Sequence, residues 1–176
     1  NVFSKIYLSG IPGLIGGIIL GIGFSSYVFA MYNTTVANTN FIIQSQTIFL
    51  AIFGYFFLKE KISKITLASI ILAISGLILM LGNTLSSGQM LGNIVAFVMP
   101  ITFAILILIV RKYPTVDMVP LQLVAGIVAM IIGFLASTKI SISLYEIFLA
   151  FLSGTFQIGL GFIIITIGAK KTLAAM

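Results

Sequence analysis

The sequence predicts an all-α fold, a polytopic bundle of transmembrane helices, on three observations. Hydrophobic residues make up 60% of the 176-residue chain, charged residues only 7%, and the mean hydropathy is +1.28. A soluble domain has roughly 25% charged residues, so this chain is expected to lie in lipid. Long apolar segments recur along the chain, and the basic residues lie mainly in the short loops between them.

Six apolar segments are long enough to span a bilayer, which takes about 20 residues. Polar turn residues separate them, as Asn33, Thr34 and Thr35 do between the first two. Ser143 and Glu146 fit a capping box, which opens a helix with a serine and a glutamate three residues later. The predicted spans are 9–31, 38–58, 65–82, 91–110, 119–137 and 145–169, and a seventh helix begins near Thr172.

The basic residues alternate with the predicted crossings. Eight of the nine fall on one side of the bundle, and only Lys139 falls on the other. Cytoplasmic loops of membrane proteins carry an excess of lysine and arginine, so the first side is predicted to be cytoplasmic. The eight residues are Lys5, Lys59, Lys61, Lys64, Arg111, Lys112, Lys170 and Lys171.

A short motif occurs twice, as Gly21-Ile22-Gly23-Phe24 and as Gly159-Leu160-Gly161-Phe162, at an offset of 138 residues. The copies lie in the first and sixth predicted helices, which cross the membrane in opposite directions. Inverted repeats of this kind are typical of secondary transporters, whose substrate site lies between the two halves. Chance similarity between glycine-rich apolar helices is the alternative.

Composition excludes most other functions. The chain has no cysteine and no histidine, and its three acidic residues, Glu60, Asp117 and Glu146, are far apart. A thiol nucleophile, a histidine-based triad and a zinc site are therefore excluded, and neither an enzyme nor a cofactor or metal is expected. The net charge of +6 is explained by membrane orientation rather than by nucleic acid. The expected partners are a small-molecule substrate and the lipid bilayer, and the sequence indicates no oligomeric state.

Polar residues in the second predicted helix are the main candidates for a substrate site. Asn40, Gln44 and Thr47 share one helix face, and amides in hydrocarbon need a partner or water. Hydrogen bonding between helices is the alternative.

Pro100 either kinks the fourth helix or exposes a backbone carbonyl to substrate. Small residues spaced by four, such as Gly17 and Gly21, predict close helix packing. The full candidate set is Phe24, Tyr27, Asn40, Gln44, Thr47, Pro100, Gln157, Phe162 and Thr166.

Two stretches resemble the EamA-like transporters of the drug/metabolite transporter superfamily. Phe57-Leu58-Lys59-Glu60-Lys61-Ile62-Ser63, followed by Ile74-Ser75-Gly76-Leu77-Ile78-Leu79, is similar to the family's "LgErls … lGv.ll" signature. The family often has proline thirteen residues before the signature glutamate, where this chain has Thr47. The sequence therefore gives no proline to kink the second helix.

The resemblance implies ten helices in two inverted halves around a central cavity that opens alternately to each side. Residues 1–89 would hold the last three helices of the first half, and 90–176 the first three helices and the start of the fourth of the second half. The chain is thus expected to be an internal fragment of a carrier of amino acids, other metabolites or drugs in the bacterial inner membrane. The alternatives are a channel subunit, a non-transporting scaffold and a membrane-embedded enzyme.

Overall fold

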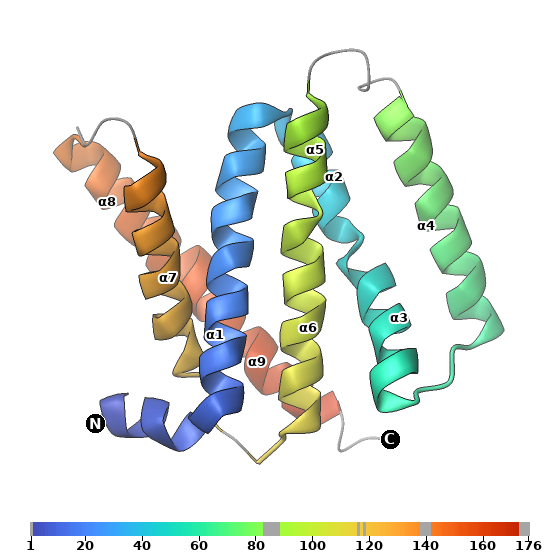
Figure 1. Cartoon of the computed structure of the whole chain (residues 1–176), viewed down its shortest axis with the longest axis horizontal. Helices are drawn as coiled ribbons and strands as arrows, with labels where there is room; N and C mark the ends of the chain where they lie inside the picture. Colours follow the sequence, from blue (N-terminus) through green and yellow to red (C-terminus); the bar gives the residue numbers. More distant parts are fainter. Residues whose placement is uncertain (1, 83–88, 116, 118, 138–141, 173–176) are drawn as a thin grey trace.

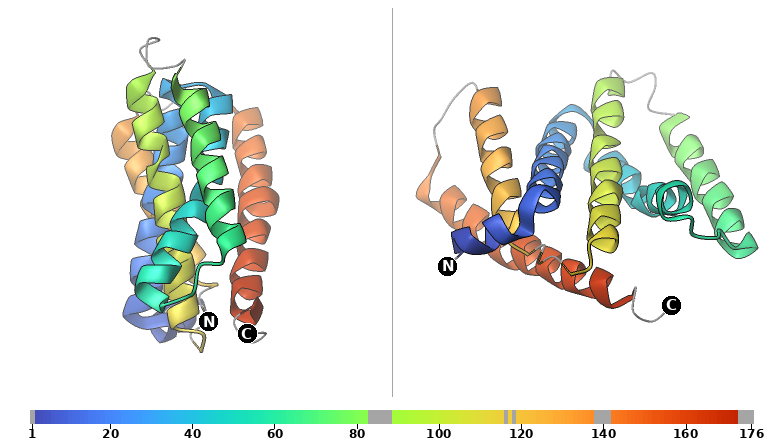
Figure 2. Two further views of the ribbon diagram at one scale, coloured as in Figure 1. Left: turned by 90° about the vertical axis from the view of Figure 1, so that its right-hand side faces the viewer. Right: turned by 60° about the horizontal axis from the view of Figure 1, so that its bottom comes forward.

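The chain forms a row of five helical crossings with a sixth laid across one face of the row. The computed structural model describes residues 2–82, 89–115, 117, 119–137 and 142–172. Successive crossings run in opposite directions (Figure 1), and α8, η1 and α9 together cross the row (Figure 2). All regular elements in the described residues are helical: α1 Val2–Asn33, α2 Val36–Gln44, α3 Gln46–Leu58, α4 Lys64–Gly82, α5 Met90–Ala96, α6 Val98–Lys112, α7 Leu121–Ala136, α8 Leu144–Leu152, the π-helix η1 Ser153–Gly159 and α9 Leu160–Thr172.

The six predicted spans correspond to these six crossings, so the predicted helical bundle is confirmed. Two of the crossings, Lys64–Met80 and Leu121–Ala136, are apolar but short. Lys139, residues 83–88 and the predicted seventh helix beyond Thr172 lie outside the described residues. The stretches long and apolar enough to span a membrane are Ser9–Asn33, Val36–Leu58, Met90–Lys112 and Leu144–Gly168.

Helix α1 begins before the predicted span and bends at Gly10. This glycine has φ +60° and ψ −161°, a backbone conformation that residues with a Cβ rarely adopt. Pro12, two residues later, lacks the N–H that would continue the regular hydrogen bonding. The segment 2–9 therefore lies at an angle to the rest of α1 (Figure 1).

The second crossing is interrupted at Ser45 although it contains no proline. The Ser45 N–H donates to the Ile42 carbonyl at 3.0 Å, and the Ser45 hydroxyl donates to the same oxygen at 2.6 Å. The Thr47 hydroxyl donates to the Gln44 carbonyl at 3.2 Å. Hydroxyls that bond to backbone carbonyls compete with regular helical hydrogen bonds and often bend helices. The absence of proline predicted no kink in this crossing. The structure nevertheless has a break at Ser45, where side-chain hydroxyls bond to backbone carbonyls.

The fourth crossing is interrupted at Phe97, three residues before Pro100. Proline lacks the N–H that would bond to the carbonyl of Ala96, four residues earlier. The Phe97 N–H donates at 3.2 Å to the Ile94 carbonyl, three residues back. The break between α5 and α6 thus lies within one turn of Pro100, where a kink caused by this proline is expected.

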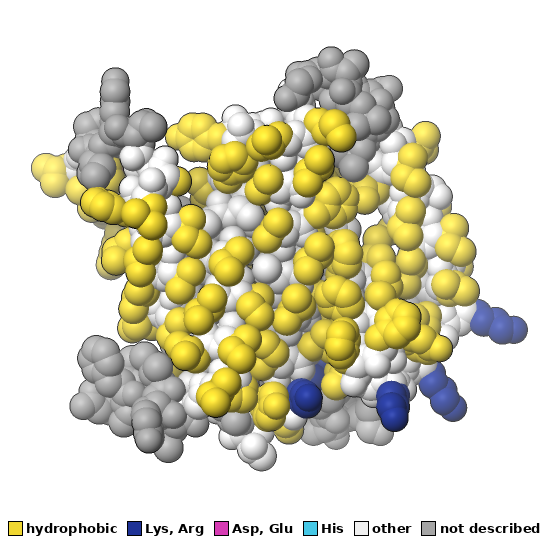
Figure 3. All heavy atoms as spheres, in the orientation of Figure 1, with side chains coloured by type: hydrophobic (Ala, Val, Ile, Leu, Met, Phe, Trp, Pro, Cys, Tyr) yellow, Lys and Arg dark blue, Asp and Glu magenta, His cyan; other side chains and the backbone are white. Residues whose placement is uncertain are grey.

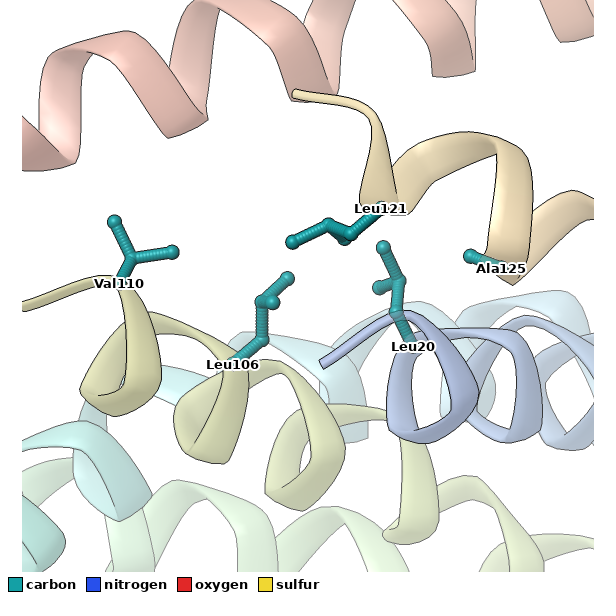
Figure 4. Packing of buried hydrophobic residues seen from close by; sticks show 5 residues of the cluster. All are labelled: Leu20, Leu106, Val110, Leu121 and Ala125. Carbon is teal, nitrogen blue, oxygen red and sulfur yellow. The ribbon is translucent and has the colours of Figure 1, made fainter. Parts of the chain in front are cut away.

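Helix α1 is the centre of the packing, because both α6 and α7 pack extensively against it. Leu20 of α1, Leu106 and Val110 of α6, and Leu121 and Ala125 of α7 form the buried core between them (Figure 4). Gly21 permits this close approach. A Cβ built on it would lie 2.7 Å from the Ala125 carbonyl oxygen and 2.7 Å from the Val128 Cβ. The predicted small-residue packing is confirmed for this helix.

The outer surface is apolar along the helices and basic at one end. Helices α4 and α8 contain no buried residue among those whose side chains are described, and Figure 3 shows apolar side chains covering the visible face. The loops that carry Lys59, Lys61, Lys64, Arg111 and Lys112 lie at the same end of the bundle (Figures 1 and 3). The predicted segregation of these basic residues is therefore confirmed. An exposed apolar belt of this kind suits lipid better than water.

Candidate functional site

The polar residues predicted on the second crossing lie on its exposed side. Asn40, Gln44 and Thr47 are all exposed, whereas Asn38 and Thr39 on the other side of α2 are buried. Thr39 donates its hydroxyl to the Thr35 carbonyl at 3.0 Å. The buried polar side chains of this crossing therefore form hydrogen bonds within the protein. The exposed amides of Asn40 and Gln44 can still bond to groups outside α2.

Tyr27 connects this exposed stripe to α1. Its hydroxyl lies 3.5 Å from Oδ1 of Asn40, which is long for a hydrogen bond between a hydroxyl and an oxygen. Gln44 follows Asn40 by four residues, so the two amides share one helix face. The contact therefore brings together candidates from the first and second crossings, while leaving Asn40 loosely held.

The aromatic candidates Phe24 and Phe162 form a second group. Phe24 of α1 and Phe162 of α9 meet edge to face, with ring centroids 5.1 Å apart and an interplanar angle of 86°. Phe103 of α6 packs on the same Phe162 ring at 5.8 Å and 78°. Tyr27 lies three residues after Phe24, on the same side of α1. The aromatic candidates of the first and sixth crossings thus meet where α9 crosses the row.

The remaining candidates are placed differently. Pro100 is fully buried in helix packing. Thr166 is buried and donates its hydroxyl to the Phe162 carbonyl of its own helix at 2.7 Å. Gln157 is exposed within the π-helix η1, a type of segment that is often found at functional sites. Of the three, Thr166 lies next to the aromatic group through its bond to Phe162.

Surface hollows of the described structure lie away from these residues. One has a volume of about 260 Å³ and is lined by Met130, Ile131, Phe134 and Leu135 of α7. Another, of about 270 Å³, is lined by Ile11, Pro12, Ile15, Ile109, Lys112 and Tyr113. None of the candidate residues lines either hollow.

A buried hydrogen-bonded cluster, which the sequence did not predict, lies at the end of the bundle opposite the basic loops. Thr34 donates its hydroxyl to Oδ1 of Asn93 at 2.6 Å, and Asn38 donates to the Thr34 hydroxyl at 3.2 Å. Asn38 and Asn93 are only 4% and 6% exposed. Gly92 makes room for the contact, since a Cβ there would lie 2.5 Å from the Asn33 carbonyl. The sequence signal was Asn93 itself, an amide in the apolar fourth segment.

At the basic end of the bundle, an ion pair joins the loop that follows α3 to α6. Nη1 of Arg111 lies 3.1 Å from both carboxylate oxygens of Glu60. The carboxylate occupies space left by Gly54, where a Cβ would lie 2.7 Å from Oε2 of Glu60. Lys59 turns the chain at the end of α3 with φ +56°, at the position where the family signature has glycine. The predicted signature thus forms a tight helix end that aims Glu60 at α6.

Residues 3–82 match the sequence model of the EamA-like transporter family. Searches among curated proteins and among solved structures returned no match. The matched stretch covers almost all of α1 to α4, including the tight turn at Lys59 and Glu60. The assignment of 90–176 to a second, inverted half stays a prediction. Residues 3–82 of this helical membrane protein are therefore similar to the EamA-like transporter family, part of the drug/metabolite transporter superfamily.

Proposed function

We propose that this protein is a secondary carrier that moves small metabolites, such as amino acids or drugs, across a bacterial inner membrane by alternating access. The observation that carries the proposal is a pair of contacts between candidates: Phe24 meets Phe162 edge to face, and the Tyr27 hydroxyl lies 3.5 Å from Oδ1 of Asn40. Gln44 lies one turn after Asn40 on the exposed side of α2. Carriers of this architecture bind substrate between their halves, near the middle of the membrane.

The two halves in this proposal are residues 1–89 and 90–176. Helix α1 and the crossing made by α8, η1 and α9 run in opposite directions (Figure 1), as inverted repeats require. They carry the two Gly-x-Gly-Phe copies, Gly21 to Phe24 and Gly159 to Phe162. Opposite direction and shared motif together support the division into halves.

The chemistry of these candidate residues suits reversible binding. Asn40, Gln44 and Thr47 supply neutral donors and acceptors, and Phe24 and Phe162 supply apolar surface. Neutral amides bind polar groups of a substrate without the desolvation cost of a buried charge. A carrier must release its substrate, and such contacts are weak enough to permit release. A channel would require a continuous polar or charged ring, whereas the polar candidates on the second crossing form one short stripe.

Orientation follows from the basic end of the bundle. The loops containing Lys59 to Lys64 and Arg111 to Lys112 are proposed to face the cytoplasm, by the excess of positive charge. Single cysteines at Ser63 and Thr35, introduced into a cysteine-free protein, should react differently with an impermeant thiol reagent in intact cells. Thr35 should be labelled and Ser63 protected. Equal labelling of the two positions would contradict the proposed topology.

The site is tested by Gln44→Leu in the full-length protein, reconstituted in liposomes and supplied with radiolabelled amino acids and drugs as probes. Transport should fall about tenfold, the change that roughly 1.4 kcal/mol of lost substrate binding produces. Ser75→Val is the matched control, because Ser75 is exposed on α4 and donates its hydroxyl to the Ile71 carbonyl at 2.9 Å. Unchanged transport of every probe by the Gln44 variant would leave this residue without a role in binding.

A further inference from the structure

We propose that the contact between Phe24 and Phe162 lies on the pseudo-two-fold axis of the carrier and is the fixed pivot about which its halves rock. The 138-residue offset of the Gly-x-Gly-Phe repeat pairs Phe24 with Phe162. These two equivalent residues touch, with their ring centroids 5.1 Å apart. The inference rests on the proposed function, since it needs two inverted halves that move.

A two-fold axis lies midway between any residue and its equivalent. Two equivalent residues can therefore touch only if the axis passes between them, as at the centre of a symmetric dimer interface. The edge-to-face contact of Phe24 with Phe162 places the axis within a few ångströms of both rings. The helices that carry them run in opposite directions and cross (Figures 1 and 2), as an axis in the membrane plane requires.

Pairs of equivalent residues behave differently from all other pairs when the carrier changes state. In an inverted-repeat carrier, the second state is reached when the two halves exchange their conformations. The pair formed by Phe24 and Phe162 maps onto itself in this exchange, so its separation is the same in both states. A contact between non-equivalent residues maps onto a different pair and is free to form in one state and break in the other.

The ion pair between Glu60 and Arg111 is a contact of this second kind. It joins the first half to the second at the basic end, at 3.1 Å, and its members are not equivalent under the 138-residue offset. It can therefore hold that end closed in one state only. In this proposal, the contact between Phe24 and Phe162 is kept throughout the cycle, whereas the ion pair between Glu60 and Arg111 forms and breaks.

The chemistry of the pivot suits this role. Edge-to-face aromatic pairs are held by dispersion and by ring quadrupoles, which tolerate small rotations better than a directional hydrogen bond does. Phe103 supports the Phe162 ring from α6 at 5.8 Å. Phe103 thus braces Phe162 within its own half, and both rings of the pivot also pack against the core between α1, α6 and α7.

The test measures distances between spin labels by electron paramagnetic resonance, in the full-length protein in lipid nanodiscs. The labels avoid the rings and use exposed neighbours. Ile22 and Leu160 are equivalent under the offset, and so are Ile18 and Phe156. A pair at Ser63 and Tyr113, after α3 and α6, reports the opening of the basic end. Each pair is measured in the parent protein and with Glu60→Gln, which removes the ion pair and should shift the population of states.

We expect the distance between Ser63 and Tyr113 to lengthen in the Glu60→Gln protein, while Ile22 to Leu160 and Ile18 to Phe156 keep their distributions. The mixed pairs, Ile18 with Leu160 and Ile22 with Phe156, should change in opposite directions, because the exchange of halves converts one into the other. A shift between Ile22 and Leu160 that follows the basic end would overturn the pivot and leave alternating access standing. An unmoved basic end in both proteins would overturn both proposals.

A second variant tests the rings themselves. Phe162→Leu keeps an apolar side chain but removes the aromatic contact with Phe24, so the distribution between Ile22 and Leu160 should broaden. Phe151→Leu is the control, because Phe151 lies on α8 and is 65% exposed. Equal distributions in the two variants would show that the ring contact does not hold the halves together.

Discussion

The two copies of the Gly-x-Gly-Phe motif have nearly the same sequence but opposite packing. Around Gly21 of α1, α7 comes so close that a Cβ would meet the Ala125 carbonyl and Val128, both at 2.7 Å. Around Gly161 of α9, a Cβ would meet no atom of the described residues within 4 Å. A small residue permits close approach, but a neighbouring helix must be present to use it. The motif therefore predicts where packing can be close without fixing its partner.

The same contrast holds for the polar residues near each copy. On the α1 side, Thr34, Asn38 and Asn93 bond to one another across helices, and Asn38 and Asn93 are nearly fully buried. On the α9 side, the hydroxyl of Thr166 bonds only within its own helix among the contacts that the structure describes, at 2.7 Å from the Phe162 carbonyl. The polar groups near the first copy thus bond between helices, whereas Thr166 of the sixth crossing bonds within its own helix.

The largest effect is expected at Gly21. Gly21→Val should destabilise the protein by about 3 kcal/mol, because the added side chain meets backbone that cannot move aside. Gly161→Val should change stability by less than about 1 kcal/mol, since valine has a somewhat higher helix propensity than glycine and enters open space. Thermal unfolding in the same detergent compares the two. Equal destabilisation would show that α9 packs as closely as α1.

A smaller effect is expected from the polar groups. Asn93→Leu should cost about 2 kcal/mol, because it leaves the half-buried Thr34 hydroxyl and the buried Asn38 amide without their bonds to Oδ1. Thr166→Val should cost under about 1 kcal/mol, since it removes one hydrogen bond within a helix. The same unfolding assay measures both. A more damaging Thr166 variant would reverse the comparison between the two sides.

The smallest effect concerns the backbone rather than the packing. Lys59→Gly should stabilise the protein by about 1 kcal/mol, because Lys59 has φ +56° and glycine adopts this conformation without steric cost. Lys61→Gly is the control, since Lys61 lies in the same loop, is exposed and is not among the residues with positive φ. Unchanged or lower stability of the Lys59 variant would mean that its side chain compensates for the strain.

Local features of the molecule could be predicted well from sequence. The six crossings, the basic end and the capping box at Ser143 and Glu146 all agree with the structure; in the box, Oε2 of Glu146 accepts from the Ser143 N–H at 2.8 Å. These features depend on residues that are close in the chain or on the transfer of whole segments into lipid. The interruption at Ser45 was missed because its hydroxyl had more than one available bonding pattern.

The sequence by itself predicted which segments are long and apolar and form helices, that successive segments run in opposite directions, and that the basic residues between them gather at one end. Only the tertiary structure decided that Asn38 is buried against Asn93 while Gln44 stays exposed, and that Phe24 meets Phe162. The physical reason is the sequence separation over which each interaction acts. Hydrophobicity and turn chemistry act within a segment, whereas the partner of an amide or a ring depends on helices from distant parts of the chain, and several arrangements satisfy the same apolar pattern.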